Sequence, residues 1–412
     1  MTSVTLKPTN VASFPDGGGH SWVFLQYAHA LRQLGCEVHW LERFQPGRSY
    51  AQDRRALRLF RNRLAEFDLA DRIAVYQRSP NGGVDVLGDC NAFNSATATD
   101  LLLDFDYLVE PALLDRFGCT ALVDIDPGLL QFWVSAGQLT IAEHDRYAST
   151  GETVGTDGAR FPDLGRSWIR FRPPVCLDLW PFAYDPDATT LTTVSGWWGG
   201  DGKGEWVTDG EDIFFENNKR VTFLELRQLP QWTDQRIELA LALGDGDESL
   251  TVRNSPDRSW RPSRLPPSGA TDYVSDQLDR AALEQDGWIV RHAREVASTP
   301  RDYRRYVQQS RGEFSCAKPS CRYFQNAWVS DRTLCYLASG KPVVVQDTGP
   351  SRLLPSGEGM FRFTDADGAL AAIEELNAHY RHHCEAAREL ARSFDAPTVL
   401  VSLLDQVLSG GR

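Results

Sequence analysis

The chain is poor in lysine and in positive charge. Five of its 43 basic residues are lysine, and 56 acidic residues give a formal net charge of −13. A protein that covers a nucleic-acid backbone needs a basic surface, so this charge argues against extended nucleic-acid binding. A local basic pocket for one small phosphate is still compatible with it.

Long apolar runs and paired cysteines are also missing. No stretch reaches the roughly 18 apolar residues of a membrane-spanning helix, and MTSVTLKPTN has no apolar core, so we expect neither a membrane span nor a secretory leader. The eight cysteines are scattered without a Cys-x-x-Cys pair, which predicts free thiols in a cytoplasmic protein. The sequence leaves a homodimer open.

The Gly-x-Gly-x-x-Gly fingerprint is absent, which counts against a dinucleotide-dependent oxidoreductase. The chain opens instead with a short strand, the turn Asp16–Ser21, a helix with apolar residues at helical spacing, and the strand Glu37–Leu41. This is a βαβ unit with a glycine-rich turn at the carboxyl end of its first strand. Ligands of such folds bind at that end.

Helices and strands alternate along the rest of the chain, which predicts two doubly wound, Rossmann-like α/β domains facing a cleft. We expect an N-terminal domain over 1–177, a C-terminal domain over 178–390, and a last helix in 391–412 that packs back on the first domain. Residues 245–272 are rich in Asp, Ser, Pro and Gly and predict a long surface excursion. The other expected strands are Leu101–Val109, Thr120–Ile125, Thr189–Ser195, Gln235–Leu243 (alternatively a short helix), Gly287–Val290, Glu313–Ala317 and Lys341–Gln346. The other expected helices are Arg54–Leu69, Pro300–Ser310, Asp331–Ser339, Ala366–Asn377 and Tyr380–Ser393.

The first glycine turn carries a candidate base. Gly18 and Gly19 let the backbone approach a ligand at a helix N-terminus, and His20 follows them as a possible general base. Asp124 and Asp126 end a predicted strand on the same side of it. They can orient His20, hold a divalent ion, accept hydrogen bonds from a sugar, or serve only in a strand-end turn.

The segment 328–349 gives the strongest signal. Ser330 can cap a helix whose first turn holds Asp331, Arg332 and Thr333, and free N–H groups, a hydroxyl and a guanidinium together suit a diphosphate. Gly-Lys-Pro then starts a buried strand. That strand delivers Gln346, Asp347 and Thr348, short polar groups suited to sugar hydroxyls, and Gly349 follows them as a further donor-site residue.

Three further residues have weaker patterns. Lys219 can reach the diphosphate or lie in a solvated turn, and Lys318 follows a strand predicted near the same site. Trp197 can stack on a base or sugar, or pack in the core. A polar terminal helix, predicted to be exposed, carries His379, His382, His383 and Cys384, but no paired spacing supports a metal there.

These motifs resemble GT-B glycosyltransferases. CYLASGKPVVVQDTG is similar to the helix–Gly-(Lys/Arg)-Pro-Val-Val–strand element of their donor domain, and GGGHSW…LRQLGCEVHWLE resembles the start of the acceptor domain in actinobacterial-type members. Retaining members often carry a glutamate where this chain has Cys335. Inverting members often use a histidine after the first glycine turn with an aspartate behind it, a pattern that His20 with Asp126 or Asp124 resembles.

The resemblance implies a glycosyltransferase that moves a sugar from a nucleotide sugar to a small-molecule acceptor, with inversion and without a metal cofactor. Its diphosphate ligands would be Ser330, Arg332, Thr333 and Lys318. The alternatives are a nucleotide-sugar epimerase of the same fold, a metal-dependent transferase of another fold that uses Asp124 and Asp126, and a non-catalytic nucleotide-sugar-binding protein.

Overall fold

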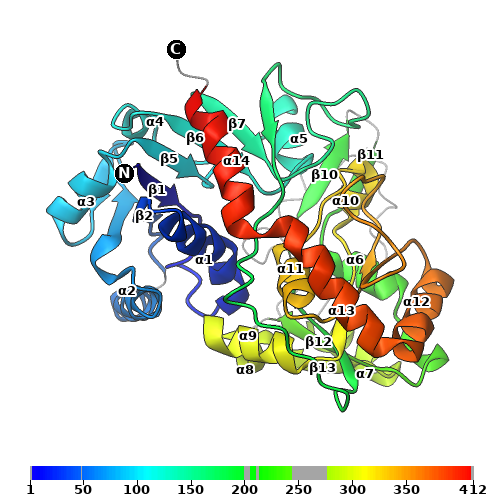
Figure 1. The fold of residues 1–412 in the computed structure, drawn as a ribbon. Helices are drawn as coiled ribbons and strands as arrows, with labels where there is room; N and C mark the ends of the chain where they lie inside the picture. The colour runs from blue at the N-terminus through cyan, green and yellow to red at the C-terminus, as the bar shows by residue number, and fades with distance from the viewer. Residues whose placement is uncertain (1, 48, 199–204, 210–212, 244–275, 410–412) are drawn as a thin grey trace, which may run out of the picture. The chain divides into compact units, whose positions relative to one another are not determined.

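The computed structural model describes residues 2–47, 49–198, 205–209, 213–243 and 276–409. The chain separates into two compact units (Figure 1). Unit 1 comprises Met1–Leu179, Ala297–Tyr303 and Ser393–Arg412, and unit 2 comprises Trp180–Val296 and Arg304–Arg392.

Unit 1 is built on an eight-stranded sheet of order β4-β3-β2-β1-β5-β6-β7-β8. All neighbouring strands are parallel except β4, which is antiparallel to β3. The strands are β1 Ser3–Lys7, β2 Glu37–Arg43, β3 Ile73–Arg78, β4 Val84–Val86, β5 Leu101–Asp104, β6 Thr120–Asp124, β7 Arg146–Ser149 and β8 Trp168–Arg170. The helices are α1 Gly18–Gln33, α2 Tyr50–Ala65, α3 Cys90–Ala96, α4 Pro111–Leu114, α5 Leu129–Ser135 and α14 Ala396–Ser409, with a short 3-10 turn η1 at Ala70–Arg72.

Unit 2 contains a six-stranded parallel sheet of order β13-β12-β9-β14-β15-β16 and a separate antiparallel hairpin, β10-β11. The strands are β9 Thr190–Gly196, β10 Trp206–Asp209, β11 Ile213–Glu216, β12 Arg236–Ala242, β13 Ile289–His292, β14 Gly312–Ser315, β15 Val343–Gln346 and β16 Met360–Phe363. The helices are α6 Lys219–Glu225, α7 Asp276–Gln285, α10 Pro319–Phe324, α11 Asp331–Ala338, α12 Ala366–Ala378 and α13 Tyr380–Ala391, with the 3-10 turn η2 at Leu229–Trp232. The chain passes between the units after Leu179, in α8 Ala293–Ala297, in α9 Pro300–Gln309 and in the 3-10 turn η4 Arg392–Phe394.

Both parallel sheets are doubly wound from a central first strand. In unit 1 the strand order reverses between β1 and β5, and in unit 2 it reverses between β9 and β14. The carboxyl ends of strands at such a reversal are where open α/β sheets bind ligands. Each unit therefore offers one favoured position for a site.

Buried apolar strands explain the sheets. Strand β5 is wholly buried (Leu101–Asp104), as is β15 (Val343–Gln346), which accounts for their nearly continuous apolar runs. A cluster in unit 2 that includes Trp197, Phe223 and Phe314 fills the space between the sheet and its helices.

Most predicted elements are confirmed with shifts of a few residues, and Gln235–Leu243 proves to contain the strand β12. The strand predicted over Leu101–Val109 is wrong in its second half. The Asp104 carboxylate accepts a hydrogen bond from the Asp106 backbone N–H at 2.9 Å, so the chain turns directly after β5. The surface excursion predicted over 245–272 lies outside the described residues.

Helix α14 belongs to unit 1 and contacts α1. The segment Ala297–Tyr303, which the sequence placed in the C-terminal domain, also belongs to the compact unit 1. Among the described residues, no helix has the length and apolar character needed to cross a membrane.

Candidate active site

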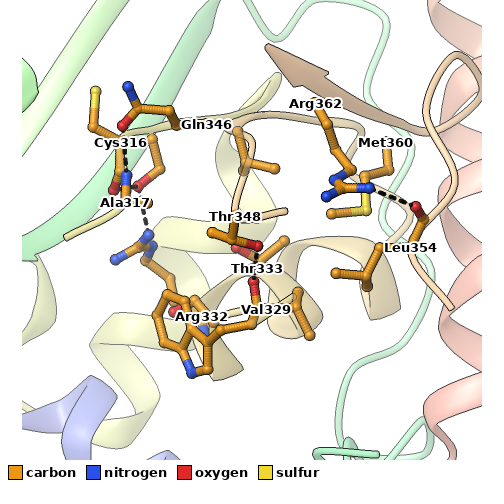
Figure 2. Close-up of a pocket in the computed structure, with 14 residues that line it drawn as sticks. Cys316, Ala317, Val329, Arg332, Thr333, Gln346, Thr348, Leu354, Met360 and Arg362 are labelled. Atoms are coloured by element: carbon orange, nitrogen blue, oxygen red, sulfur yellow. Dashed lines mark hydrogen bonds between the residues drawn. The ribbon is translucent and has the colours of Figure 1, made fainter. Parts of the chain in front are cut away.

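Unit 2 has an open pocket at the carboxyl edge of its sheet (Figure 2). Strands β14 and β15 contribute their carboxyl-terminal residues, β16 contributes Met360 and Arg362, and the N-terminus of α11 lines another side. The residues that line it are Ser315, Cys316, Ala317, Trp328, Val329, Ser330, Arg332, Thr333, Val345, Gln346, Thr348, Leu354, Met360 and Arg362. The pocket thus lies on the β14 side of the strand reversal of unit 2, along β14, β15 and β16.

The N-terminus of α11 is the main source of hydrogen-bond donors in this pocket. Ser330 is the N-cap, as the sequence predicts, and its hydroxyl accepts a hydrogen bond from the Arg332 N–H at 3.3 Å. Thr333 is 2% exposed and lies in the first turn. The first N–H groups of a helix and its dipole attract anions. Asp331 is in the same turn but is not among the lining residues.

The guanidinium of Arg332 is held by the fold of unit 2. Its Nε lies 2.6 Å from Oε1 of the fully buried Glu313, and its other nitrogens donate to the Val194 carbonyl at 3.0 Å and the Ser315 hydroxyl at 2.5 Å. The predicted direct role of Arg332 at a diphosphate therefore competes with an ion pair through Nε and with hydrogen bonds from both other nitrogens.

Lys219 and Lys318 differ in the partners of their ammonium groups. Lys318 Nζ lies 3.0 Å from the Glu205 carboxylate. Lys219 makes no ion pair with any residue that the structure describes, and its Nζ lies 5.9 Å from the ring centroid of Trp328, which lines the pocket. Burial, followed by the neighbouring charge of Arg332, lowers the pKa of Lys219 to about 7. Lys219 is therefore the better placed cation for an anionic ligand.

The polar residues after β15 have different surroundings. The side-chain oxygen of Gln346 accepts the Ala317 N–H at 3.1 Å, and the Thr348 hydroxyl donates to the Trp328 carbonyl at 2.8 Å (Figure 2). Both residues line the pocket. Asp347 is not among the lining residues, because Arg362 holds its carboxylate at 2.9 Å.

Gly349 follows these residues at φ +113°, and a Cβ there would lie 2.6 Å from that of Gln325. This glycine is needed for the turn and for close packing.

The prediction that Trp197 stacks on a ligand is wrong. Trp197 is fully buried in the core of unit 2, where its indole N–H donates to Asp279 at 2.8 Å. Arg220 binds the same carboxylate at 2.6 Å. Trp328 is the aromatic residue that lines the pocket instead.

His20 lies at the start of α1 in unit 1, and its Nε2 is 2.7 Å from the Thr9 carbonyl oxygen. A carbonyl only accepts, so Nε2 carries the proton and Nδ1 keeps its lone pair. Burial lowers the pKa of His20, while the Thr9 hydrogen bond and the negative charge of Asp126 oppose the shift. The imidazole is therefore neutral at pH 7, as a general base must be.

Among the described residues, neither Asp124 nor Asp126 hydrogen-bonds to His20, whose Nε2 contacts Thr9, and the predicted orienting role of these aspartates stays a prediction. Asp124 is fully buried and accepts hydrogen bonds from Ser149 at 2.7 Å and Gln131 at 2.9 Å. Burial raises the pKa of Asp124 to about 6. Asp126 acts on His20 only through its charge.

Gly18 and Gly19 are explained by packing within unit 1. A Cβ on Gly18 would lie 2.5 Å from the Ala297 carbonyl oxygen, and one on Gly19 would lie 2.6 Å from the ring of Tyr303. These glycines admit the segment Ala297–Tyr303 against the start of α1.

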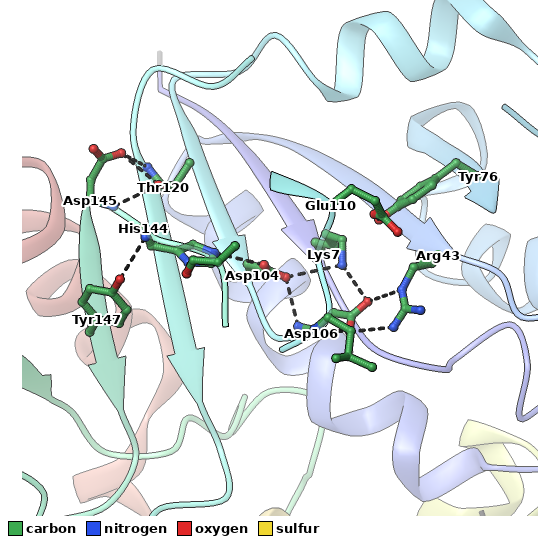
Figure 3. Close-up of polar contacts among 12 residues, drawn as sticks. Lys7, Arg43, Tyr76, Asp104, Asp106, Glu110, Thr120, His144, Asp145 and Tyr147 are labelled. Carbon is green, nitrogen blue, oxygen red and sulfur yellow. Dashed lines mark hydrogen bonds and ion pairs between the residues drawn. The ribbon is translucent and has the colours of Figure 1, made fainter. Parts of the chain in front are cut away.

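A buried charge network, which the sequence patterns missed, occupies the strand reversal of unit 1 (Figure 3). Lys7, at the end of β1, lies 2.7 Å from Asp106 and 3.5 Å from Asp104, and Arg43 binds Asp106 at 2.6 Å. His144 lies 3.1 Å from Asp104. A lysine at the end of an apolar strand was the available signal, since such a buried charge needs a partner.

The histidine-rich helix is less exposed than the sequence suggested. His383 is 1% exposed and Cys384 is fully buried, because this face of α13 packs on α11 and α12. His379 and His382 remain exposed.

No protein-family model matches the chain, and no curated protein matches it. Solved structures of GT-B glycosyltransferases do resemble it. HepE of Anabaena in complex with UDP-glucose is 12% identical, with a TM-score of 0.57 over 99% of this chain and 100% of HepE. An alpha-glucosyltransferase in complex with UDP and a 13-mer DNA is 10% identical, with a TM-score of 0.56 over 99% of each chain. The chain therefore has the GT-B fold, with two Rossmann-like domains.

Proposed function

We propose that the chain is a glycosyltransferase that moves a sugar from a nucleoside diphosphate sugar to a small-molecule acceptor. The observation that carries the proposal is the pocket of unit 2, where the N-terminus of α11 meets the carboxyl ends of parallel strands, with the Lys219 ammonium 5.9 Å from the ring centroid of the lining residue Trp328. HepE, which shares the fold, was solved with UDP-glucose. This supports the same class of donor.

In the proposed donor complex, the first N–H groups of α11, the Thr333 hydroxyl and Lys219 bind the diphosphate. Negative charge grows on this group as the glycosidic bond breaks, so these donors stabilise the transition state. Trp328 offers an aromatic face to the donor, while Gln346 and Thr348 face its hydroxyl groups. Protein cations and helix N–H groups supply the positive charge, and the mechanism uses no metal.

His20 is the proposed base. Its Nδ1 accepts the proton of an acceptor hydroxyl, while Nε2–H stays bound to the Thr9 carbonyl. The charge of Asp126 favours the imidazolium that forms. Direct attack of the activated hydroxyl on the donor then inverts the configuration at the sugar carbon.

The net charge supports a small acceptor. The alpha-glucosyltransferase of similar fold was solved with DNA, but at a net charge of −13 this chain would repel a nucleic-acid backbone. A small molecule carries no such penalty.

The first experiment is a thermal-shift screen with UDP, GDP, TDP and ADP and their sugars, with and without EDTA. We expect one nucleotide family to raise the melting temperature in both conditions. No shift with any of them would contradict the donor pocket.

The second experiment measures transfer by the variant His20→Gln, which keeps an N–H donor but removes the base. We expect kcat to fall by about 10²–10⁴-fold while nucleotide binding is unchanged. The matched control is His29→Ala on the same helix, which loses only a partly exposed ion pair with Asp178. Transfer by His20→Gln within about tenfold of wild type would contradict a base at this position. Epimerised product without an acceptor, or binding without turnover, would favour the epimerase or the non-catalytic alternative.

A further inference from the structure

Three side chains that can bind a metal converge where α12 meets α13 in unit 2. They are Glu375, His379 and His383, and their ligand atoms lie within 4.8 Å of one another. The carboxylate Oε1 of Glu375 lies 2.8 Å from Nδ1 of His379 and 3.4 Å from Nε2 of His383. One oxygen thus faces a nitrogen from each imidazole.

The break between the two helices creates this convergence. In a continuous helix, residues eight apart are separated by about 12 Å along the axis, so Glu375 and His383 could not share a ligand. Helix α12 ends at Ala378, and His379 has φ −127° and ψ 37°, outside the helical range. The chain changes direction between α12 and α13 (Figure 1), and His383 in α13 lies 3.4 Å from Glu375.

The ligand set and its dimensions suit a borderline transition metal. Two imidazoles and one carboxylate form a ligand set that zinc sites use, with an open position left for water. Ligands at 2.0–2.2 Å from a tetrahedral zinc ion are about 3.3–3.6 Å apart. The carboxylate–imidazole separations here are 2.8 Å and 3.4 Å, and all three ligand atoms lie within 4.8 Å of one another, so small side-chain rotations bring them to this spacing. His379 and Glu375 have side chains 60% and 50% exposed, which gives an ion a path from solvent.

We propose that Glu375, His379 and His383 form a binding site for Zn²⁺ or a similar divalent transition metal at the junction of α12 and α13. The ion replaces the two contacts between the carboxylate and the imidazoles. With the metal on Nε2, His383 carries its proton on Nδ1, and the long 3.4 Å contact from the Gly359 N–H to Nδ1 is given up. Binding releases no cysteine or other residue from the core.

The site is separate from the proposed sugar transfer. The His383 ring lies 4.9 Å from the ring of Phe361 in β16, whereas the flanking Met360 and Arg362, which point to the other face of the strand, line the donor pocket. A bound ion would therefore hold α12 and α13 together on the face of β16 opposite the donor pocket.

The test is a calorimetric titration of the tag-free full chain with Zn²⁺, repeated with Co²⁺ to record its visible spectrum. We expect one equivalent of metal, a spectrum without thiolate-to-cobalt charge transfer, and an affinity loss of more than about a hundredfold in His379→Ala and in Glu375→Gln. This loss exceeds the 10–100-fold that removal of an outer-shell partner costs. Both side chains are exposed, so the variants should fold as wild type does.

The matched control is His382→Ala. This histidine is also exposed on α13 but is not one of the three ligands, so its variant should bind as wild type. No saturable binding, a thiolate band, or equal affinity in wild type and His379→Ala would each overturn the proposal.

Discussion

Replacement of Lys219 tests the donor pocket most directly. Burial lowers the pKa of Lys219 to about 7, so about half of the free protein carries the charge at pH 7 and about one hundredth at pH 9. A diphosphate binds the charged form, and the apparent Kd for UDP should therefore rise about 50-fold between pH 7 and pH 9. The phosphate groups themselves are fully ionised over this range, since their last pKa is about 6.

Two variants separate charge from titration. In Lys219→Arg the charge does not titrate below pH 12, so the Kd should be nearly independent of pH. In Lys219→Met a charged hydrogen bond of about 1.5–3 kcal/mol is lost, which weakens UDP binding about 10–150-fold at pH 7 and removes the pH dependence. The control Lys318→Met should lose less than about tenfold, because Glu205 already holds that ammonium.

Isothermal titration at several pH values measures these constants. Linkage fixes the direction of the pH dependence of nucleotide binding. Folding without ligand lowers the pKa of Lys219 from 10.5 to about 7, so the charged form is destabilised in the free protein. Nucleotide binding therefore takes up a proton and weakens as pH rises. A Kd for wild type that is flat from pH 7 to pH 9, as a lysine of ordinary pKa would give, refutes the reasoning. So does tight binding by Lys219→Met.

Three further predictions concern stability. Arg332→Met should leave the fully buried Glu313 carboxylate unpaired and lower the free energy of unfolding by about 3–5 kcal/mol. The melting temperature should fall accordingly, and the double variant with Glu313→Gln should largely restore it. An unchanged melting temperature with lost nucleotide binding would instead assign Arg332 to the ligand. Gly18→Ala should destabilise unit 1 by about 1–3 kcal/mol, because its Cβ meets backbone oxygen atoms, whereas Gly158→Ala, with no contact nearer than 3.9 Å, should have little effect. Burial raises the pKa of Asp124 from 3.8 to about 6, so the folded state holds this proton more tightly than the unfolded state. The protonated carboxyl therefore stabilises the folded state fully below pH 3.8, and about 3 kcal/mol of this stability is lost as pH rises through 6. The melting temperature of Asp124→Asn relative to wild type should accordingly increase from pH 4 to pH 7. A constant difference would contradict the burial argument.

Local periodicity and turn chemistry were enough to predict the two Rossmann-like sheets. A continuous apolar run bounded by Gly and Pro predicts a strand over Lys341–Gln346, which the structure has as Val343–Gln346, and Ser330 before an apolar helix predicts its cap, which is also present. These features depend on residues close together in the sequence, which is why pattern reasoning reached them.

Side-chain partnerships between distant segments were not predictable from patterns. The role assigned to Arg332 assumed a free guanidinium, but Glu313 lies on the neighbouring strand β14 and pairs with it. Trp197 follows a strand beside a glycine-rich loop, yet Asp279, 82 residues later, satisfies its indole N–H and allows burial. A sequence shows that a polar group exists, and only the fold shows what satisfies it.

The two compact units interleave along the chain, which passes between them after Leu179, Val296, Tyr303 and Arg392. A single cut in the gene therefore cannot exchange one unit for its counterpart from a relative. A foreign C-terminal part would bring its own version of Ala297–Tyr303, which must fit against the resident Gly18 and Gly19. A change of donor by recombination would thus require the foreign segment to pack against the start of α1. Point substitutions around the pocket of unit 2 leave that packing unchanged.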